Sequence, residues 1–437
     1  MAGWARDGEQ VEAYVGRRSD TDVVIYGGEI ESLSSATSEG VGIRVIADGR
    51  QGFAYAGSLD LSVVEETMAE ARDNAAFATP DEYLGLAVPD GVAAAELDLW
   101  CDDLASFPAQ AKIDLALDLE RRVKAGDPRI RSVESSNYGD GASESAVVTS
   151  TGMSATARRT GCHLSAYALA GEGDGTQTGG GYSVGRGPAD LDVEEAAADA
   201  VERSTRLLGA RKPPSARLTV VLDRRVTTTL LAVLSGTLNG ESVLKGRSLF
   251  ANRVGEQVAV DALTLVDDPT NPDAYGASPF DAEGLACRCN ELIRDGVLQG
   301  FVYNTHAGRR AGVASTGSAV RGGFKSAPGV GCRALSLAPG PESQAGIMAR
   351  VGDGLLVQGI SGVHSGVNPV SGDFSVGAEG LMIRDGVLAE PVREITIAST
   401  IQRMLRDVVA VGNDLEWLPG AAAGVTLAIA DMSMSGA

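Results

Sequence analysis

Alternating apolar and polar residues at the start of the chain predict paired β-strands. The pattern runs through residues 11–15, 21–35 and 40–57. It is interrupted by Gly27-Gly28 and Asp48-Gly49, and such dipeptides favour tight hairpin turns because they tolerate positive φ. We therefore expect an antiparallel sheet in this region.

Four segments show apolar residues at helical spacing instead. The first is predicted to bury one face, formed by Val64, Met68, Ala71 and Ala75. Ser62 precedes Glu65 by three positions, which is the spacing of a capping box at the start of that helix. The other helices are predicted at residues 109–126, 191–208 and 224–240.

Strand-like stretches separate and follow these helices. They comprise residues 129–140, 143–159, 161–173 and 217–223, and beyond Gly240 strands and turns predominate. The hexapeptide IRDGVL occurs at 293–298 and again at 383–388, and each Asp-Gly predicts a hairpin. The glycine-rich stretch 171–187 matches neither GxGxxG nor a P-loop, so we predict a mobile hairpin tip there.

This order of elements predicts an α+β fold in three parts. We expect an N-terminal αβ domain at residues 1–85, a central αβ domain at 104–210 and a large antiparallel β-rich domain at 217–437. The proline-containing stretch 78–108 shows little periodicity and is predicted to link the first two.

The charge balance argues against nucleic acid and membrane surfaces as partners. The 437 residues include 37 Lys and Arg against 58 Asp and Glu, a net charge of −21 that would repel phosphates. The first residues lack a basic segment followed by an apolar one, and no apolar run reaches about 18 residues. We therefore expect a soluble, cytoplasmic protein.

The cysteines and histidines offer few candidates for chemistry. Five scattered cysteines in a chain of this size are predicted to be reduced, and Cys287 and Cys289 are predicted to form a buried structural pair on a strand. The three histidines, His163, His306 and His364, are too far apart to share a helix face as in HExxH. Cys162 and His163 are neighbours, but neighbours on a strand point to opposite faces.

Two hydrolase mechanisms stay open at this stage. A Ser-His-Asp triad assembles in space and cannot be excluded from sequence, although no GxSxG stands between a strand and a helix. Paired carboxylates could come from many residues. For Asp281, Glu283, Asp373 and Glu379 the turn-rich surroundings predict solvated or turn-capping acids.

Several longer stretches, in a fixed order, resemble the TldD/PmbA family. They are GVGIRVIADGRQGFAYAG at 40–57, residues 267–312 around DDPTNPDAYGASPFDAEG, STGSAVRGG at 315–323, GVHSGVNPVSGDFSVGAEG at 362–380 and VGNDLEW at 411–417. The resemblance extends over nearly the whole chain. It implies two kinds of member: TldD-type chains, which hold zinc with a helical HExxxH and a later cysteine, and PmbA or TldE chains, which lack these groups and pair with TldD.

This chain resembles the PmbA or TldE kind at the positions of the zinc-binding residues. The two histidine positions of HExxxH are occupied by Ala232 and Thr237, and the glutamate position by Val233. No cysteine follows Cys332, so no thiol is present where the later ligand is expected. Alanine and valine offer no lone pair to a metal, and without metal or carboxylate base nothing activates a water.

The resemblance therefore implies a metal-free, non-catalytic subunit of a peptidase complex. Its expected partners are a TldD-type chain that carries the zinc and an extended or unfolded peptide substrate. His364 and Asn368, within the stretch 361–380, are the candidates for facing that substrate, with a structural or substrate-contacting role for His364. The alternatives are an autonomous serine or cysteine hydrolase and a regulatory protein, as the family's name modulator of DNA gyrase implies.

Overall fold

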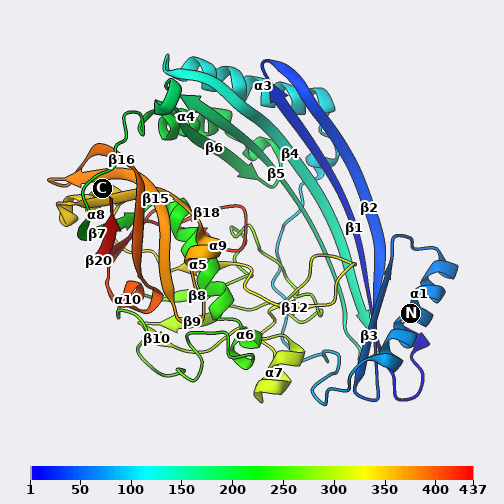
Figure 1. Ribbon diagram of the computed structural model, residues 1–437. Helices are drawn as coiled ribbons and strands as arrows, with labels where there is room; N and C mark the ends of the chain where they lie inside the picture. Colours follow the sequence, from blue (N-terminus) through cyan, green and yellow to red (C-terminus); the bar gives the residue numbers. More distant parts are fainter. Residues whose placement is uncertain (1, 437) are drawn as a thin grey trace.

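Two β-structures face each other in the computed structural model, which describes residues 2–436 (Figure 1). A long, curved sheet forms one lobe, and a small barrel with its surrounding loops forms the other. The predicted α+β class and the β-rich C-terminal region are confirmed. No helix in this part of the chain is both long and apolar enough to cross a membrane.

The curved sheet has six antiparallel strands in the order β3-β2-β1-β4-β5-β6. Their bounds are β1 Gln10–Tyr26, β2 Glu29–Ala47, β3 Arg50–Ala56, β4 Ile130–Thr149, β5 Ser154–Ala170 and β6 Gln177–Gly185. The two predicted N-terminal hairpins are confirmed, with positive φ at Gly27, Gly28, Asp48 and Gly49. The three strands predicted between 129 and 173 are in fact two long ones, because β4 and β5 pair continuously past the predicted breaks.

The sheet unites strands from two of the predicted domains. β1 pairs with β4 from Glu12 opposite Thr149 to Ile25 opposite Ser136. The boundaries 1–85 and 104–210 stay a prediction, but the strands of these two segments share one sheet. Residues 78–101 between them form no helix or strand, as expected for a linker.

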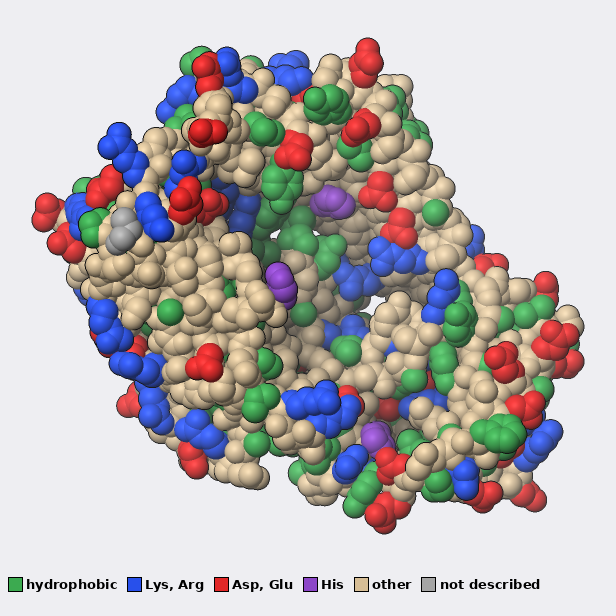
Figure 2. All heavy atoms as spheres, in the orientation of Figure 1, with side chains coloured by type: hydrophobic (Ala, Val, Ile, Leu, Met, Phe, Trp, Pro, Cys, Tyr) green, Lys and Arg blue, Asp and Glu red, His purple; other side chains and the backbone are tan. Residues whose placement is uncertain are grey.

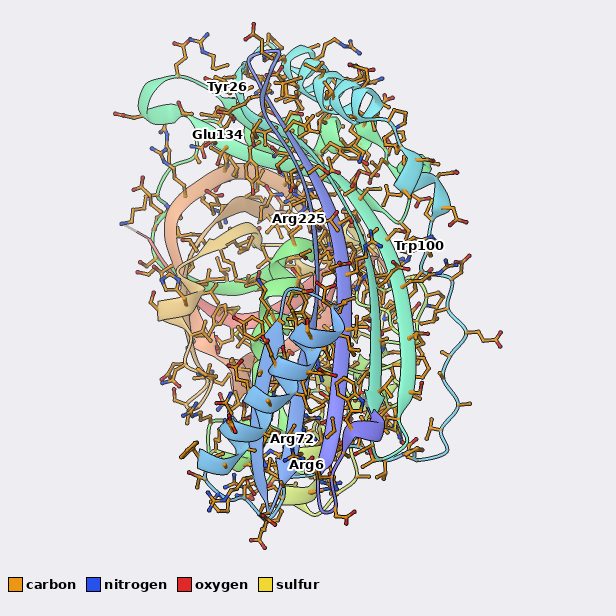
Figure 3. All side chains as sticks on the ribbon, turned by 90° about the vertical axis from the view of Figure 1, so that its right-hand side faces the viewer. Arg6, Tyr26, Arg72, Trp100, Glu134 and Arg225 are labelled. Carbon is orange, nitrogen blue, oxygen red and sulfur yellow. The ribbon has the colours of Figure 1, made fainter. Side chains whose placement is uncertain are left out.

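Helices cover the two ends of the sheet and leave its middle open (Figures 1 and 3). α1 (Leu61–Phe77) buries Val64, Met68, Ala71 and Ala75 against β2 and β3, as predicted. α3 (Ala109–Gly126) and α4 (Val193–Thr205) cover the other end over a second apolar core. The predicted capping box is wrong, because Asp60 is the N-cap residue and Ser62 lies within the first turn.

The glycine-rich stretch differs in part from its prediction. Residues 171–176 form the loop of the β5-β6 hairpin, but the rest of the stretch is not a tip. Residues 177–185 form β6, and α4 lies directly against this strand. A Cβ at Gly179 would lie 2.1 Å from the backbone nitrogen of Ser204, and one at Gly181 would lie 2.0 Å from the oxygen of Ala196. The glycines therefore serve close helix packing rather than a mobile tip.

In the C-terminal lobe, the pairing of β16 with β20 closes five strands into a barrel. They are β7 Ala216–Leu222, β14 Gly354–Ser361, β15 Asp373–Arg384, β16 Val387–Thr400 and β20 Leu427–Ser435, with β17 Val408–Val411 added beside β20. Only β7 and β14 run parallel. α5 (Arg224–Thr237) packs Val226, Leu230 and Leu234 into the same core as the barrel strands, and α8 (Gln344–Val351) packs Ile347 and Met348 into a smaller cluster.

Short elements complete this lobe. The strands are β8 Leu265–Asp267, β9 Asn290–Arg294, β10 Val297–Leu298, β11 Ala319–Val320, β12 Gly329–Val330, β13 Leu335–Leu337, β18 Glu416–Trp417 and β19 Ala423–Gly424. The helices are α2 Asp102–Ser106 in the linker region, α6 Gly240–Leu244, α7 Thr305–Ala311, α9 Val363–Gly366 and α10 Ile401–Arg406, with 3-10 turns η1 Ala2–Trp4, η2 Gly173–Gly175 and η3 Pro188–Asp190. Both copies of IRDGVL form the predicted hairpins, β9-β10 and β15-β16.

A buried charge network fastens the two lobes together. Glu12 on β1 accepts hydrogen bonds from Arg44 at 2.5 Å and from Arg321 of the C-terminal lobe at 2.6 Å. The Arg44 guanidinium also lies 3.5 Å from Glu283. Burial alone would raise the pKa of Glu12, but the two arginines outweigh it and hold that pKa below its usual range.

Candidate functional site

A cleft of about 1030 Å³ lies between the curved sheet and the C-terminal lobe. The middle of β1, β4 and β5 forms one wall, and loops around residues 275–282 and 321–333 form the other. Figure 2 shows the hollow between the lobes, with Lys and Arg side chains in blue around it. A concave, partly polar cavity of this size is where ligands bind most often.

Strand register explains why the middle of the sheet is open. Residues paired across the strands form rows. In one row Gly16 lies beside Ser145, which lies beside Ala157. Further along the sheet, in another row, Gly141 lies beside Gly161. Residues paired across strands share a face, so small side chains of three strands gather on the side of the C-terminal lobe. Large residues here would fill the cleft.

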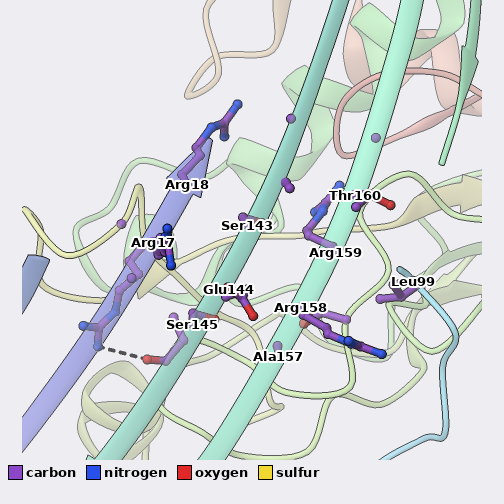
Figure 4. Close-up of a pocket in the computed structure, with 18 of the residues that line it drawn as sticks. Arg17, Arg18, Leu99, Ser143, Glu144, Ser145, Ala157, Arg158, Arg159 and Thr160 are labelled. Carbon is purple, nitrogen blue, oxygen red and sulfur yellow. Dashed lines mark hydrogen bonds between the residues drawn. The ribbon is translucent and has the colours of Figure 1, made fainter. Parts of the chain in front are cut away.

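Between these rows a charged one crosses the sheet. Arg18 on β1, Ser143 on β4 and Arg159 on β5 are directly paired (Figure 4). Arg18 donates to both carboxylate oxygens of Asp20 at 2.8 Å. Arg159 reaches across the cleft and donates to the backbone oxygen of Tyr275 at 2.8 Å. The row therefore presents guanidinium groups to whatever occupies the cleft.

Cationic side chains outnumber carboxylates around the cleft. The seven cationic residues along it are Arg17, Arg18, Arg158, Arg159, Arg321, Arg333 and Lys325, and the five carboxylates are Asp20, Asp22, Asp140, Glu144 and Asp281. Of these, Arg17, Glu144 and Arg158 form the row that points to the opposite face of the sheet. Groups of both signs are already engaged: Arg18 with Asp20, Arg321 with Glu12, and Asp140 with Lys112 at 2.5 Å. This local excess of positive charge contrasts with the chain's net charge of −21.

Asp281 and Glu283 differ from the expectation of solvated acids. Asp281 is 5% exposed and Glu283 1%, so both are buried at the lobe interface. Asp281 does cap a turn, accepting the backbone N–H groups of Glu283, Leu285 and Ala319. Burial, together with the neighbouring charge of Glu283, raises the pKa of Asp281 to about 7. A carboxyl that titrates near neutrality beside a cleft is suited to proton exchange, although its three backbone bonds also give it a structural role.

The other two acids lie away from the cleft lining. Asp373 is exposed and accepts the hydroxyl of Ser371 at 2.6 Å, as expected for an acid in a turn. Glu379 is partly buried on β15, and burial raises its pKa. The expectation of a solvated acid is therefore wrong for Glu379 as well.

No pair of histidine and nucleophile forms within residues 2–436. His163 lines the cleft over Gly139, and burial lowers its pKa. Cys162 lies on the other face of β5, as predicted, where burial raises the pKa of its thiol to about 12. His306 on α7 instead contacts Asp81 of the linker at 2.9 Å. The three histidines appear as separate purple patches in Figure 2.

The cysteines form no disulfide in the part of the chain that the structure describes. The predicted pair of Cys287 and Cys289 is wrong, because Cys287 is buried whereas Cys289 is exposed, and residues 287–289 lie in a loop. The strand β9 begins only at Asn290, so the alternation of the sequence does not persist as strand geometry.

The three residues that the sequence resemblance places at the HExxxH positions lie on α5. Ala232 is exposed, Val233 packs against the barrel core, and Thr237 is completely buried. The Thr237 hydroxyl donates to the backbone oxygen of Leu234 at 2.8 Å. Within residues 2–436, no three His, Cys, Asp or Glu side chains are grouped as metal ligands.

His364 and Asn368 are not among the residues that line the cleft. His364 belongs to the short helix α9 and is exposed. The Asn368 side chain accepts the backbone N–H groups of Val370 and Ser371 at 2.9 and 3.2 Å and thereby stabilises a turn. That either residue faces a substrate stays a prediction.

Family models cover the chain in three consecutive matches. Residues 11–75 match the PmbA/TldA metallopeptidase domain 1, residues 102–208 the central domain and residues 215–436 the C-terminal domain. The chain belongs to the PmbA/TldD family. The resemblance seen in the sequence is thereby confirmed.

Relatives of this PmbA/TldD family member share most of its length. It is 29% identical to the metalloprotease PmbA of Escherichia coli O157:H7 over 423 residues, 95% of this chain and 90% of that protein. The crystal structure of a putative modulator of a DNA gyrase from Thermotoga maritima matches with a TM-score of 0.90 at 25% identity, over 98% and 96% of the two chains. TldE from Thermococcus kodakarensis has the same fold, with a TM-score of 0.90 at 23% identity over 98% and 97%.

Sequence reasoning missed the arginines of the cleft. Two adjacent pairs, Arg17-Arg18 and Arg158-Arg159, lie on predicted strands. Since neighbours on a strand point to opposite faces, one arginine of each pair must face the inside of a two-layered molecule. The sequence therefore contained this indication of inward-facing arginines. Only the pairing of β1, β4 and β5 shows that Arg18 and Arg159 lie in the same row.

Proposed function

We propose that this chain is a metal-free, non-catalytic subunit of a TldD/TldE-type metallopeptidase complex. In this role it helps enclose extended or unfolded peptides, and a zinc-bearing TldD-type partner cleaves them. The observation that carries the proposal is the residue content of α5, where Ala232, Val233 and Thr237 stand at the positions that the resemblance assigns to HExxxH. None of the three can act as a strong zinc ligand or as a carboxylate base.

The burial of Thr237 adds to this argument. Its hydroxyl already bonds to the helix backbone and faces the core rather than a cavity. An imidazole at this position would have to displace packed neighbours before it could reach a metal. Thr237 therefore contributes to the packing of α5 against the core.

The cleft supports a peptide-binding role for the subunit. The outer edge of β2 from Glu29 to Gly40 has no strand paired to it within residues 2–436, because β3 pairs only with residues 41–47. Ala36 and Ser38 of this edge also line the cleft. An extended peptide could pair its main chain with such an edge with little sequence preference.

Native mass and zinc content test this proposal directly. We expect the chain alone to bind no stoichiometric zinc and to hydrolyse no peptide, and a complex co-expressed with a TldD-type chain to do both. The zinc is measured by atomic emission and the mass by native mass spectrometry. Stoichiometric zinc on this chain alone, or peptide hydrolysis by it that chelators do not affect, would contradict the proposal.

A regulatory role is the second candidate, and one observation favours it. The matched Thermotoga maritima structure is described as a putative modulator of a DNA gyrase. A direct assay of gyrase supercoiling with and without this chain separates the two candidates. The third candidate, an autonomous serine or cysteine hydrolase, has no histidine bonded to a serine or cysteine among residues 2–436 to support it.

A further inference from the structure

Arg159 and Arg333 come from opposite walls of the cleft, and both contact the segment Tyr275–Gly276, Arg159 through its side chain and Arg333 through its backbone. Arg159 donates to the Tyr275 oxygen at 2.8 Å, and its guanidinium lies 5.5 Å from the Tyr275 ring centre. A Cβ on Gly276 would lie 1.8 Å from the backbone oxygen of Arg333, so this loop passes directly against Arg333. Both side chains line the cleft.

Neither arginine has an ion-pair partner within residues 2–436. The side chain of Arg159 forms a single hydrogen bond, to Tyr275. The side chain of Arg333 forms only a long one of 3.5 Å, to the backbone oxygen of Ala319. Asp267 accepts the backbone N–H of Arg333 but forms no ion pair with its guanidinium. The Nε of Arg333 is buried without a hydrogen-bond partner.

The surroundings make these free guanidinium groups costly. Burial lowers the pKa of Arg159, and the like charges of Arg186, Arg333 and Arg18 lower it further. Like charges in a partly desolvated site repel one another, and an unsatisfied buried N–H loses its hydrogen bonds to water. An anion between Arg159 and Arg333 would relieve both costs.

The chemistry of the anion follows from the donors and from the rest of the chain. A guanidinium group presents parallel N–H groups that match the two oxygens of a carboxylate. Nucleic acid is disfavoured as the source of the anion by the net charge of −21. We propose that Arg159 and Arg333 form a carboxylate-binding subsite that recognises an acidic side chain or the C-terminus of an extended peptide in the cleft. This inference rests on the proposed role in peptide binding and adds a chemical preference to it.

Calorimetric titration of the full-length chain with three unlabelled peptides tests the subsite. The first peptide has glutamates and an amidated C-terminus, the second has glutamines and a free C-terminus, and the third has glutamines and an amidated C-terminus. We expect the first, the second or both to bind at least about tenfold more tightly than the third, and this preference to shrink as salt increases. Which of the two binds tightly identifies the source of the carboxylate.

Variants of Arg159 and Arg333 then test whether the preference for a carboxylate depends on these two residues. R159Q and R333Q should each abolish it, and R159K should weaken it because lysine lacks the planar fork. Arg131, an exposed arginine on β4 that does not line the cleft, supplies the matched control R131Q, which should keep the preference. Circular dichroism checks that each variant folds, and the salt dependence of the unaltered chain needs no variant.

Equal binding of all three peptides would overturn the subsite, as would a preference that survives in folded R159Q and R333Q. These results leave the proposed function intact if the complex with a TldD-type chain still cleaves neutral peptides. A carboxylate preference without complex formation would support the subsite and contradict the proposed function.

Discussion

Glu12 and Arg321, 309 residues apart in sequence, are joined by a 2.6 Å hydrogen bond between Oε1 and Nη2. Both side chains are 1% exposed. Arg321 also lies over the ring of Tyr14, 4.4 Å from its centre, and donates to the oxygen of Ala282. This contact joins the C-terminal lobe to β1 beside the cleft, which Arg321 also lines.

Replacing Glu12 by alanine should destabilise the protein strongly. The change leaves Arg44 and Arg321 buried without their shared carboxylate, and breaking a buried pair costs about 3–5 kcal/mol. The free energy of unfolding in urea measures the effect. The control E390A removes one partner of the exposed Arg384–Glu390 pair and should cost about 1 kcal/mol or less. Similar losses in both variants would show that the network adds no special stability.

Stability should decrease as pH rises toward neutrality because of Asp281. Its pKa in the folded chain is about 7, above the ordinary value of 3.8, so the folded state holds this proton more tightly than the unfolded state does. The resulting stabilisation is complete below pH 4 and is lost progressively up to about pH 7, by at most about 4 kcal/mol. Urea unfolding at several pH values from 4 to 8 measures this.

The variant D281N separates this residue from other titrating groups. Asparagine cannot ionise, so the decrease in stability between pH 4 and 7 should be smaller than in the unaltered chain, even if the variant is less stable at every pH. D174N, at an exposed position, should retain the full decrease. An unchanged slope in D281N would refute the assignment.

Histidine should be tolerated at one motif position of α5 and not at the other. Ala232 is exposed, so A232H should change the free energy of unfolding by less than about 0.5 kcal/mol. Thr237 is completely buried, and T237H should cost about 1–3 kcal/mol through overpacking. Thermal melts of the two single variants compare them. Equal melting temperatures would show that the helix retains room for a ligand at Thr237.

Replacing His364 by alanine should leave most peptide cleavage by the complex intact. The residue is exposed on α9, and none of the hydrogen bonds within residues 2–436 involves its ring. A nucleophile-activating histidine would instead be indispensable, with a loss of roughly 10⁴-fold or more. The initial rate of hydrolysis of an unfolded protein by the co-expressed complex measures the difference, with H306A as a comparison. Complete loss in H364A alone would contradict the proposed role.

Sequence patterns predicted the local elements well and the site poorly. The apolar face of α1 and the turns at Gly27-Gly28 and Asp48-Gly49 were correct, since each depends on a few consecutive residues. The predicted pair of Cys287 and Cys289 failed because a short alternation can lie in a loop. The hairpin tip predicted at 171–187 is confined to residues 171–176, because glycine serves close packing as well as turns, and only the position of α4 distinguishes the two.

By itself, the sequence determined the family and the α+β class, because these depend on residue types in order along the chain. The tertiary structure decided that Arg18, Ser143 and Arg159 form one row and that Arg333 faces it across the cleft. It also decided that Asp281 and Glu283 are buried between the lobes rather than solvated. Such placements follow from strand register and lobe packing, which bring together residues more than a hundred positions apart, and no local periodicity encodes them.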